Sequence, residues 1–202
     1  MLDTLLQNII NRDFFNESPK IVAPKLLGKY IVRRIDEHYL VGKIVEVEAY
    51  LAFGDAAAHN AVGKTKRSIS LFNDAGYTYV HTMRQYCLID IVTESSDKPG
   101  SVLIRAIEPI IGIDKMLENR KVQVVENIGN GPGKVCMAMQ IKKEHNGIDI
   151  TDVNSQIFIC NIDAELDVDQ VLNRNRVGIS KATELLLGFY IKNNSFVSKL
   201  SK

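Results

Sequence analysis

The feature that most constrains the fold is the run YLVGKIVEVEAYL, from Tyr39 to Leu51. β-Branched and aromatic residues recur along it, which is typical of a strand. The shorter run KYIVRRI precedes it with only DEH between them, so the two runs predict a β-hairpin. Strand alternation then places Glu46, Glu48 and Tyr50 on one face with Ile44, opposite an apolar face.

Further strand-like runs follow without regular alternation with helices, which indicates an α+β fold with an antiparallel or mixed sheet in one domain over residues 1–202. The segment YTYVHTMRQYCLIDIVT is interrupted at Arg84-Gln85 and predicts a second hairpin or a bulged strand. We expect further strands in SVLIRAIEP, QIFIC and ELLLGFYIKNNSFVSK, and irregular chain over residues 52–75. We expect helices over residues 1–12, from near Ala23 to Gly28, in IIGIDKMLENRK, and in NGPGKVCMAMQI after its turn.

The composition is that of a soluble globular protein, with 46% apolar and 24% charged residues in 202. No run of about 20 apolar residues is present, so we expect no membrane span. Polar residues interrupt MLDTLLQNIINRDFF, which favours an amphipathic helix and arm over residues 1–20 rather than a signal peptide. The cysteines, Cys87, Cys136 and Cys160, form no CxxC pair, so we expect free thiols in the cytoplasm and neither zinc nor disulfides.

The net charge of +1 neither requires nor excludes nucleic acid as a partner. Local basic clusters leave two interpretations open, a solvated surface or a DNA-binding face. These clusters are Lys29, Arg33 and Arg34, and then Lys64, Lys66 and Arg67.

The chain lacks GxGxxG, P-loop, HExxH and GxSxG motifs, so the chemistry rests on acid–base residues. If the face of Glu46 and Glu48 is enclosed, repulsion and desolvation would raise a carboxyl pKa and prepare a general base. The alternative is a solvated face. Arg105 lies within the apolar VLIRAIEP, where it needs a carboxylate partner such as Glu46, Glu48 or Glu108. His59 could be structural or catalytic.

Five blocks occur in order along the chain: APKLLGKYIVRR, GKIVEVEAYL with DAAAH, VLIRAIEP, NGPGKVCMAM and RVGI. Together they resemble the alkyladenine (3-methyladenine) DNA glycosylase family of bacterial type, from about Ala23 to Ser198. The resemblance implies a monofunctional base-excision repair enzyme. It would flip an alkylated or deaminated purine out of double-stranded DNA and hydrolyse the N-glycosidic bond with water, leaving an abasic site.

The resemblance also implies a single domain around a curved antiparallel sheet with a protruding β-hairpin that enters DNA. It implies no metal and no cofactor, and we expect a monomer that is cytoplasmic and associated with the nucleoid when it works. An aromatic pocket would favour cationic alkylated purines, which are also good leaving groups.

The family's functional positions transfer to residues of this chain. Glu48 matches the general base, Arg105 an arginine that helps to hold the water, and Val177 a backbone carbonyl that contacts the water. Tyr50 and His59 match residues that pack on the flipped base. We further expect Lys64, Lys66 and Arg67 to contact the DNA backbone.

This chain departs from the family pattern in the second hairpin. His81 replaces the opposite stacking tyrosine, and Asp90 replaces an asparagine that helps to exclude normal guanine. The intercalating tyrosine corresponds to Arg84 or, in a shifted register, to Met83. These changes concern affinity and the preferred lesion. Two alternatives remain: a catalytically weak or inactive protein of the same fold that binds damaged DNA, and a small-molecule hydrolase using Glu48 and His59.

Overall fold

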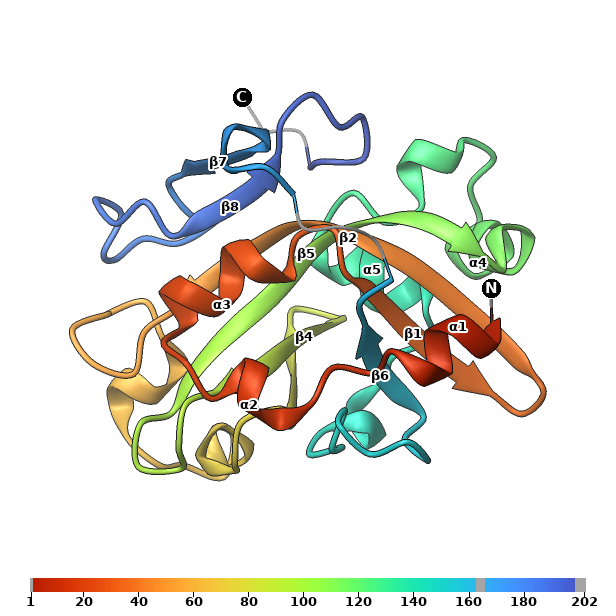
Figure 1. Cartoon of the computed structure of the whole chain (residues 1–202). Coiled ribbons are helices and arrows are strands. Elements are labelled where there is room, and N and C mark those ends of the chain that lie inside the picture. The colour runs from red at the N-terminus through yellow and green to blue at the C-terminus, as the bar shows by residue number, and fades with distance from the viewer. Residues whose placement is uncertain (1, 163–165, 199–202) are drawn as a thin grey trace.

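The fold is organised around strand β2 (His38–Tyr50), which is paired along both of its edges. A computed structural model describes residues 2–162 and 166–198. β1 (Tyr30–Ile35) and β8 (Gly188–Ile191) pair with successive halves of one edge, and β5 (Gly100–Ile111) runs along the other. Figure 1 shows β2 and β5 side by side across the molecule.

The described strands form one sheet in the order β3-β4-β5-β2-β1-β6, and β7 joins through β8. Every pairing is antiparallel, which confirms the predicted α+β class and settles the antiparallel alternative. Both predicted hairpins are present, with turns at Asp36-Glu37 and Arg84-Gln85. The remaining strands are β3 (Thr78–Met83), β4 (Tyr86–Thr93), β6 (Ile157–Cys160) and β7 (Val171–Arg174), the last of which was not predicted.

The helices are short and flank the sheet. The α-helices are α1 (Leu2–Gln7), α2 (Arg12–Phe15), α3 (Pro19–Leu26), α4 (Ile113–Arg120) and α5 (Pro132–Ala138). The 3₁₀ turns are η1 (His59–Val62), η2 (Ile69–Phe72), η3 (Val125–Asn127), η4 (Lys143–His145) and η5 (Val168–Gln170). Residues 52–75 are otherwise irregular, as predicted.

Two predicted helices have wrong boundaries. The expected helix over residues 1–12 ends at Gln7, and a separate helix starts at Arg12 after an Asn11 side-chain cap. α3 begins at Pro19 rather than near Ala23, because the fixed φ of proline suits a first helical position.

The main hydrophobic core joins α3 and α5 to the central strands. Val22 and Leu26 from α3, Ile104 from β5, and Val135 and Met139 from the α5 region belong to one buried cluster. Figure 1 shows α3 in front of the long strands and α5 behind them. The two helices therefore cover opposite faces of the sheet, which explains why β2 and β5 are buried over most of their length.

The first basic cluster is not a solvated surface. Lys29 and Arg33 are only 4% and 8% exposed. Lys29 donates to Asn161 Oδ1 at 2.9 Å, and an Arg33 nitrogen lies 2.9 Å from His145 Nε2. The three cysteines are free thiols, as predicted. Within residues 2–162 and 166–198, no helix combines the length and apolar character needed to cross a membrane.

Candidate active site

The face of β2 that carries Glu46 and Glu48 is enclosed, because each residue is only 1% exposed. Arg105 reaches both carboxylates from β5: its Nε lies 3.0 Å from Glu46 Oε1, and its Nη1 lies 3.1 Å from Glu48 Oε1. The third candidate partner, Glu108, instead accepts a hydrogen bond from Asn194 at 3.0 Å. The solvated interpretation of this face is therefore excluded.

Glu48 has a raised pKa and accepts hydrogen bonds at both of its oxygens. Its Oε2 accepts from the Tyr50 hydroxyl at 2.9 Å, and its Oε1 accepts from the Val177 backbone N–H at 2.6 Å. Burial raises its pKa, and this outweighs the lowering by Arg105, Val177 and Tyr50. Glu48 is thus a fixed carboxylate with the enhanced basicity that proton transfer requires.

Glu46 has a different environment, which resolves its role. It contacts Arg174 as well as Arg105, and its Oε2 accepts from the Ser198 backbone N–H at 2.8 Å. Both carboxylate oxygens are therefore occupied by donors from three segments. Glu48 lines the cavity over this face whereas Glu46 is not among its lining residues, so Glu46 anchors Arg105 and Glu48 is the carboxylate that faces the cavity.

A cavity of ≈ 290 Å³ lies over this face, close to the lower end of the range for small-molecule sites. It brings together residues from β2, β3, β4, β5 and the segments at His59 and Val177. The sequence-predicted residues that line it are Glu48, Tyr50, His59, His81, Met83, Asp90, Arg105 and Val177.

Aromatic rings from three segments gather in the cavity. The His81 ring stacks on Tyr79, with centroids 5.0 Å apart, and meets the His59 ring edge-on at 4.4 Å. His59 Nδ1 lies 3.1 Å from the Tyr79 hydroxyl. Burial lowers the pKa of His59, and the neighbouring His81 lowers it further. The lowered pKa favours the neutral form of the His59 imidazole. Burial also raises the pKa of Tyr50, which remains a hydrogen-bond donor to Glu48.

His81 and Asp90, the two pocket residues that depart from the family pattern, contact each other. His81 Nε2 lies 3.0 Å from Asp90 Oδ2, and the two side chains are only 8% and 5% exposed. The Ser101 hydroxyl donates to Asp90 Oδ1 at 3.4 Å. His81 Nδ1 is buried and has no hydrogen-bond partner among the described residues. The sequence placed both residues in the pocket but gave no sign of this pairing.

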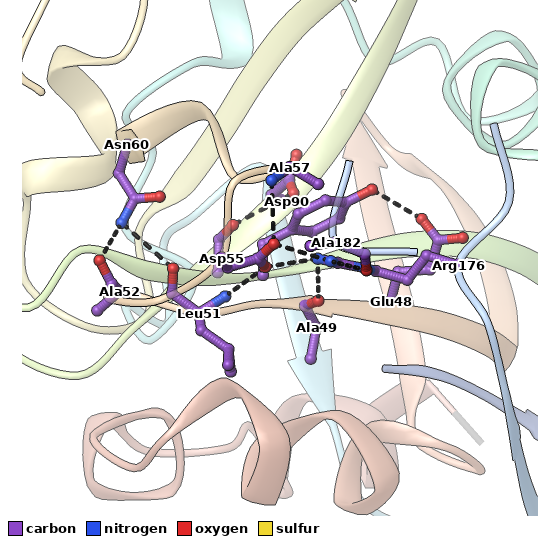
Figure 2. A network of polar contacts seen from close by, with 12 residues as sticks. Glu48, Ala49, Leu51, Ala52, Asp55, Ala57, Asn60, Asp90, Arg176 and Ala182 are labelled. Carbon is purple, nitrogen blue, oxygen red and sulfur yellow. Dashed lines mark hydrogen bonds and ion pairs between the residues drawn. The ribbon is translucent and has the colours of Figure 1, made fainter. Parts of the chain in front are cut away.

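A buried ion pair that was not predicted supports the site. Arg176 donates to Asp55 through both terminal nitrogens, one at 2.8 Å, and both side chains are 0% exposed. Asp55 also accepts from the Leu51 and Ala57 backbone N–H groups, each at 3.1 Å. Figure 2 shows Asp55 between this loop backbone and Arg176. The pair ties the loop after β2 to the segment that bears Val177, whose backbone N–H donates to Glu48.

Arg176 also contacts Tyr50, a residue that lines the cavity. Its guanidinium carbon lies 4.6 Å from the centroid of the Tyr50 ring, and it donates to the Ala49 carbonyl at 3.0 Å. Gly178, two residues further on, has φ +78 with open space where a Cβ would lie. The sequence contained one signal for the Asp55–Arg176 pair: Asp55 begins the block DAAAH, and Arg176 begins the block RVGI.

The second hairpin and the second basic cluster flank the cavity. Met83 pairs with Tyr86 across the turn and is 53% exposed, although it also lines the cavity. Arg84 is exposed in the turn with φ 55. Arg67 donates to the Thr82 carbonyl of β3 at 3.0 Å and so joins the basic cluster to the hairpin.

The other two basic residues of the cluster, Lys64 and Lys66, are exposed. The Lys64 ammonium lies 5.4 Å from the centroid of the Phe72 ring. Among residues 2–162 and 166–198, no group of three or more His, Cys, Asp or Glu side chains could hold a metal ion.

Comparison with known proteins identifies the family. The family model described as methylpurine-DNA glycosylase (MPG) matches residues 13–195. This chain belongs to the methylpurine-DNA glycosylase family. Relatives named "Putative 3-methyladenine DNA glycosylase" occur in several bacteria. The protein from Prosthecochloris aestuarii is 41% identical over 192 residues, with 94% of this chain and 91% of that protein covered.

Two clostridial members of the methylpurine-DNA glycosylase family, which carry the same printed name, are similar over almost their whole length. The protein from Clostridium novyi is 42% identical over 204 residues, and that from Clostridium perfringens strain SM101 is 40% identical over 204 residues. In both comparisons the match covers 94% of this chain and 98% of the relative. The predicted family is therefore confirmed.

Proposed function

We propose that this chain is a DNA repair glycosylase that hydrolyses the N-glycosidic bond of an alkylated or deaminated purine, with Glu48 as the general base. The observation that carries this proposal is Glu48 itself, a 1% exposed carboxylate of raised pKa in a cavity rich in aromatic side chains. Membership of the methylpurine-DNA glycosylase family makes alkylated DNA the substrate.

In the proposed reaction, Glu48 takes a proton from a water molecule as the water oxygen bonds to the sugar C1′. The C1′–N bond breaks, and its electron pair leaves with the base. A cationic alkylated purine departs as a neutral molecule, so it needs no added proton. The carboxylate also stabilises the positive charge that develops on the sugar. Arg105 and the Val177 N–H fix the orientation of Glu48.

The aromatic side chains suit a flipped base. We propose that Tyr50 and His59 pack on the extruded purine and that His81 faces it from the other wall of the cavity. Stacking in the pocket offsets part of the stacking lost from the duplex. Val177 keeps its proposed second role, a carbonyl contact to the attacking water.

The DNA contacts are also proposals. Met83 suits the role of the wedge better than Arg84, because its side chain is apolar and exposed and lies beside the cavity. It could fill the gap that the flipped base leaves in the duplex. Lys64, Lys66 and Arg67 would bind phosphates beside it. We propose that residues 1–202 act as a single-domain monomer on double-stranded DNA in the cytoplasm, associated with the nucleoid during repair.

The test is to incubate the protein with alkylated DNA and to chromatograph the released bases. We expect the wild-type protein to release alkylated purines, and Glu48→Gln to bind lesion duplexes but release no base. Glu118→Gln removes an exposed carboxylate and serves as the control, with unchanged release. Near wild-type release by Glu48→Gln would disprove the role of Glu48. Lesion binding without any release by the wild-type protein would favour the alternative of an inactive damaged-DNA-binding protein.

A further inference from the structure

Asp90 differs from the other buried carboxylates in its partner. The buried acidic residues of the described chain are Glu46, Glu48, Asp55 and Asp90. Each of the first three contacts an arginine side chain. Within the part of the chain that the structure describes, the ion-pair partner of Asp90 is His81, at 3.0 Å.

A histidine is a conditional counter-charge, because its imidazole loses its proton within the physiological pH range, whereas an arginine remains charged. Asp90 therefore has no permanently charged side-chain partner among the described residues, in a site where its own side chain is only 5% exposed. A buried charge without a fixed partner is costly. A cationic molecule in the same cavity would therefore be stabilised by Asp90.

The cavity brings that charge to the place where a base would bind. Asp90 and His81 line it together with Glu48. A purine with a positive charge supplies the counter-charge that Asp90 lacks, whereas a neutral purine does not.

We infer that Asp90, positioned by His81, is a specificity-determining residue that favours cationic N-alkylpurines over neutral damaged purines such as hypoxanthine. This inference rests on the proposed function and assigns Asp90 no part in bond cleavage. The attraction between the Asp90 carboxylate and a positive charge on the base, at a separation below about 10 Å and an effective dielectric constant of about 20, corresponds to a preference of about tenfold or more for the cationic base. Asparagine at this position would remove the charge and keep the shape.

The test measures single-turnover base release from two duplexes, one with 7-methylguanine, which is cationic, and one with hypoxanthine, which is neutral. We expect Asp90→Asn to lower the ratio of the two rates, cationic over neutral, by about tenfold or more. Asp74→Asn makes the same change in net charge at an exposed residue and should leave the ratio unchanged. An unchanged ratio in folded Asp90→Asn would overturn the inference and leave the proposed function intact.

A second variant covers the case in which Asp90→Asn does not fold. His81→Gln places an uncharged amide beside Asp90 in place of the imidazole, so the ratio should stay at the wild-type value or rise. A tenfold fall in this variant would overturn the inference. If the wild-type protein releases neither base, the proposed function fails. The inference is then tested by binding to the same two duplexes: Asp90→Asn should reduce the preference for the cationic lesion, and an unchanged ratio of the two dissociation constants would overturn the inference.

Discussion

The Asp55–Arg176 pair leads to a quantitative prediction about stability. Asp55→Asn keeps the size of the side chain but leaves the Arg176 guanidinium, which is 0% exposed, without a counter-charge. Breaking a buried pair by removing one partner costs about 3–5 kcal/mol in the free energy of unfolding. For a chain of this length, the melting temperature should therefore fall by roughly 6–20 °C.

The assay is equilibrium unfolding in urea, followed by circular dichroism. The control is Glu118→Gln, which breaks an exposed ion pair with Lys115 at 2.8 Å and should cost at most about 1 kcal/mol. Adding Arg176→Met to Asp55→Asn removes the stranded charge, so the double variant should lose less than the sum of the two single variants. A loss below about 1 kcal/mol for Asp55→Asn would refute the reasoning about burial.

The pH dependence of this stability gives a second check of the same pair. Burial alone would raise the pKa of Asp55, but the Arg176 hydrogen bonds and the backbone N–H groups lower it below its ordinary value. The stabilisation is therefore fully present above the unfolded pKa of about 3.9 and is lost as the pH falls through the lower folded value. The difference between wild-type and Asp55→Asn should shrink over this acidic range. A constant difference would contradict this assignment.

Three further predictions concern activity and DNA binding. The raised pKa of Glu48 should make the rate of base release fall with decreasing pH, with a midpoint above the ordinary carboxyl pKa of about 4.3. Single-turnover rates from about pH 4 to pH 8 would measure this midpoint. A midpoint at the ordinary value would contradict the raised pKa. Met83→Ala should weaken binding to lesion duplexes several-fold more than binding to single strands, in titrations by fluorescence anisotropy, and equal losses would argue against a wedge. Neutralising Lys64, Lys66 and Arg67 together should reduce the slope of log affinity against log salt by up to about 2.7, and an unchanged slope would reject the phosphate contacts.

The strands and the face that carries Glu46 and Glu48 could be predicted because their signals are local. The run from Tyr39 to Leu51 fixed the central strand, and alternation alone put Glu46 and Glu48 on one face. Arg105 was rightly expected to seek a carboxylate, since an isolated guanidinium in an apolar strand is costly. The choice between a solvated and an enclosed face depended on distant segments, because the backbone N–H groups of Val177 and Ser198 cover Glu48 and Glu46, and the alternation of one strand does not contain them.

The pairings between distant segments could not be predicted. Asp55 and Arg176 are separated by 121 residues, and their charges are of the kind usually found on a surface. The register between β2 and β5 shifts on both sides of Glu46, so simple alternation does not give the positions opposite it. Likewise, β7 is a short, half-exposed strand that joins the sheet by pairing with β8, and its sequence lacks a strong pattern.

The double pairing of β2 separates the rigid and adaptable parts of the molecule. Glu48 lies opposite Leu103 of β5 on one side and Gly188 of β8 on the other, so its backbone can open only if both partners separate. The tip of the β3–β4 hairpin lies at the end of the sheet, where small local fluctuations suffice to expose its amide protons. Amide hydrogen exchange should therefore be among the slowest in the chain around Glu48 and fast at Met83 and Arg84. In the proposed function, the hairpin could then adjust to distorted DNA while the position of Glu48 stays constant.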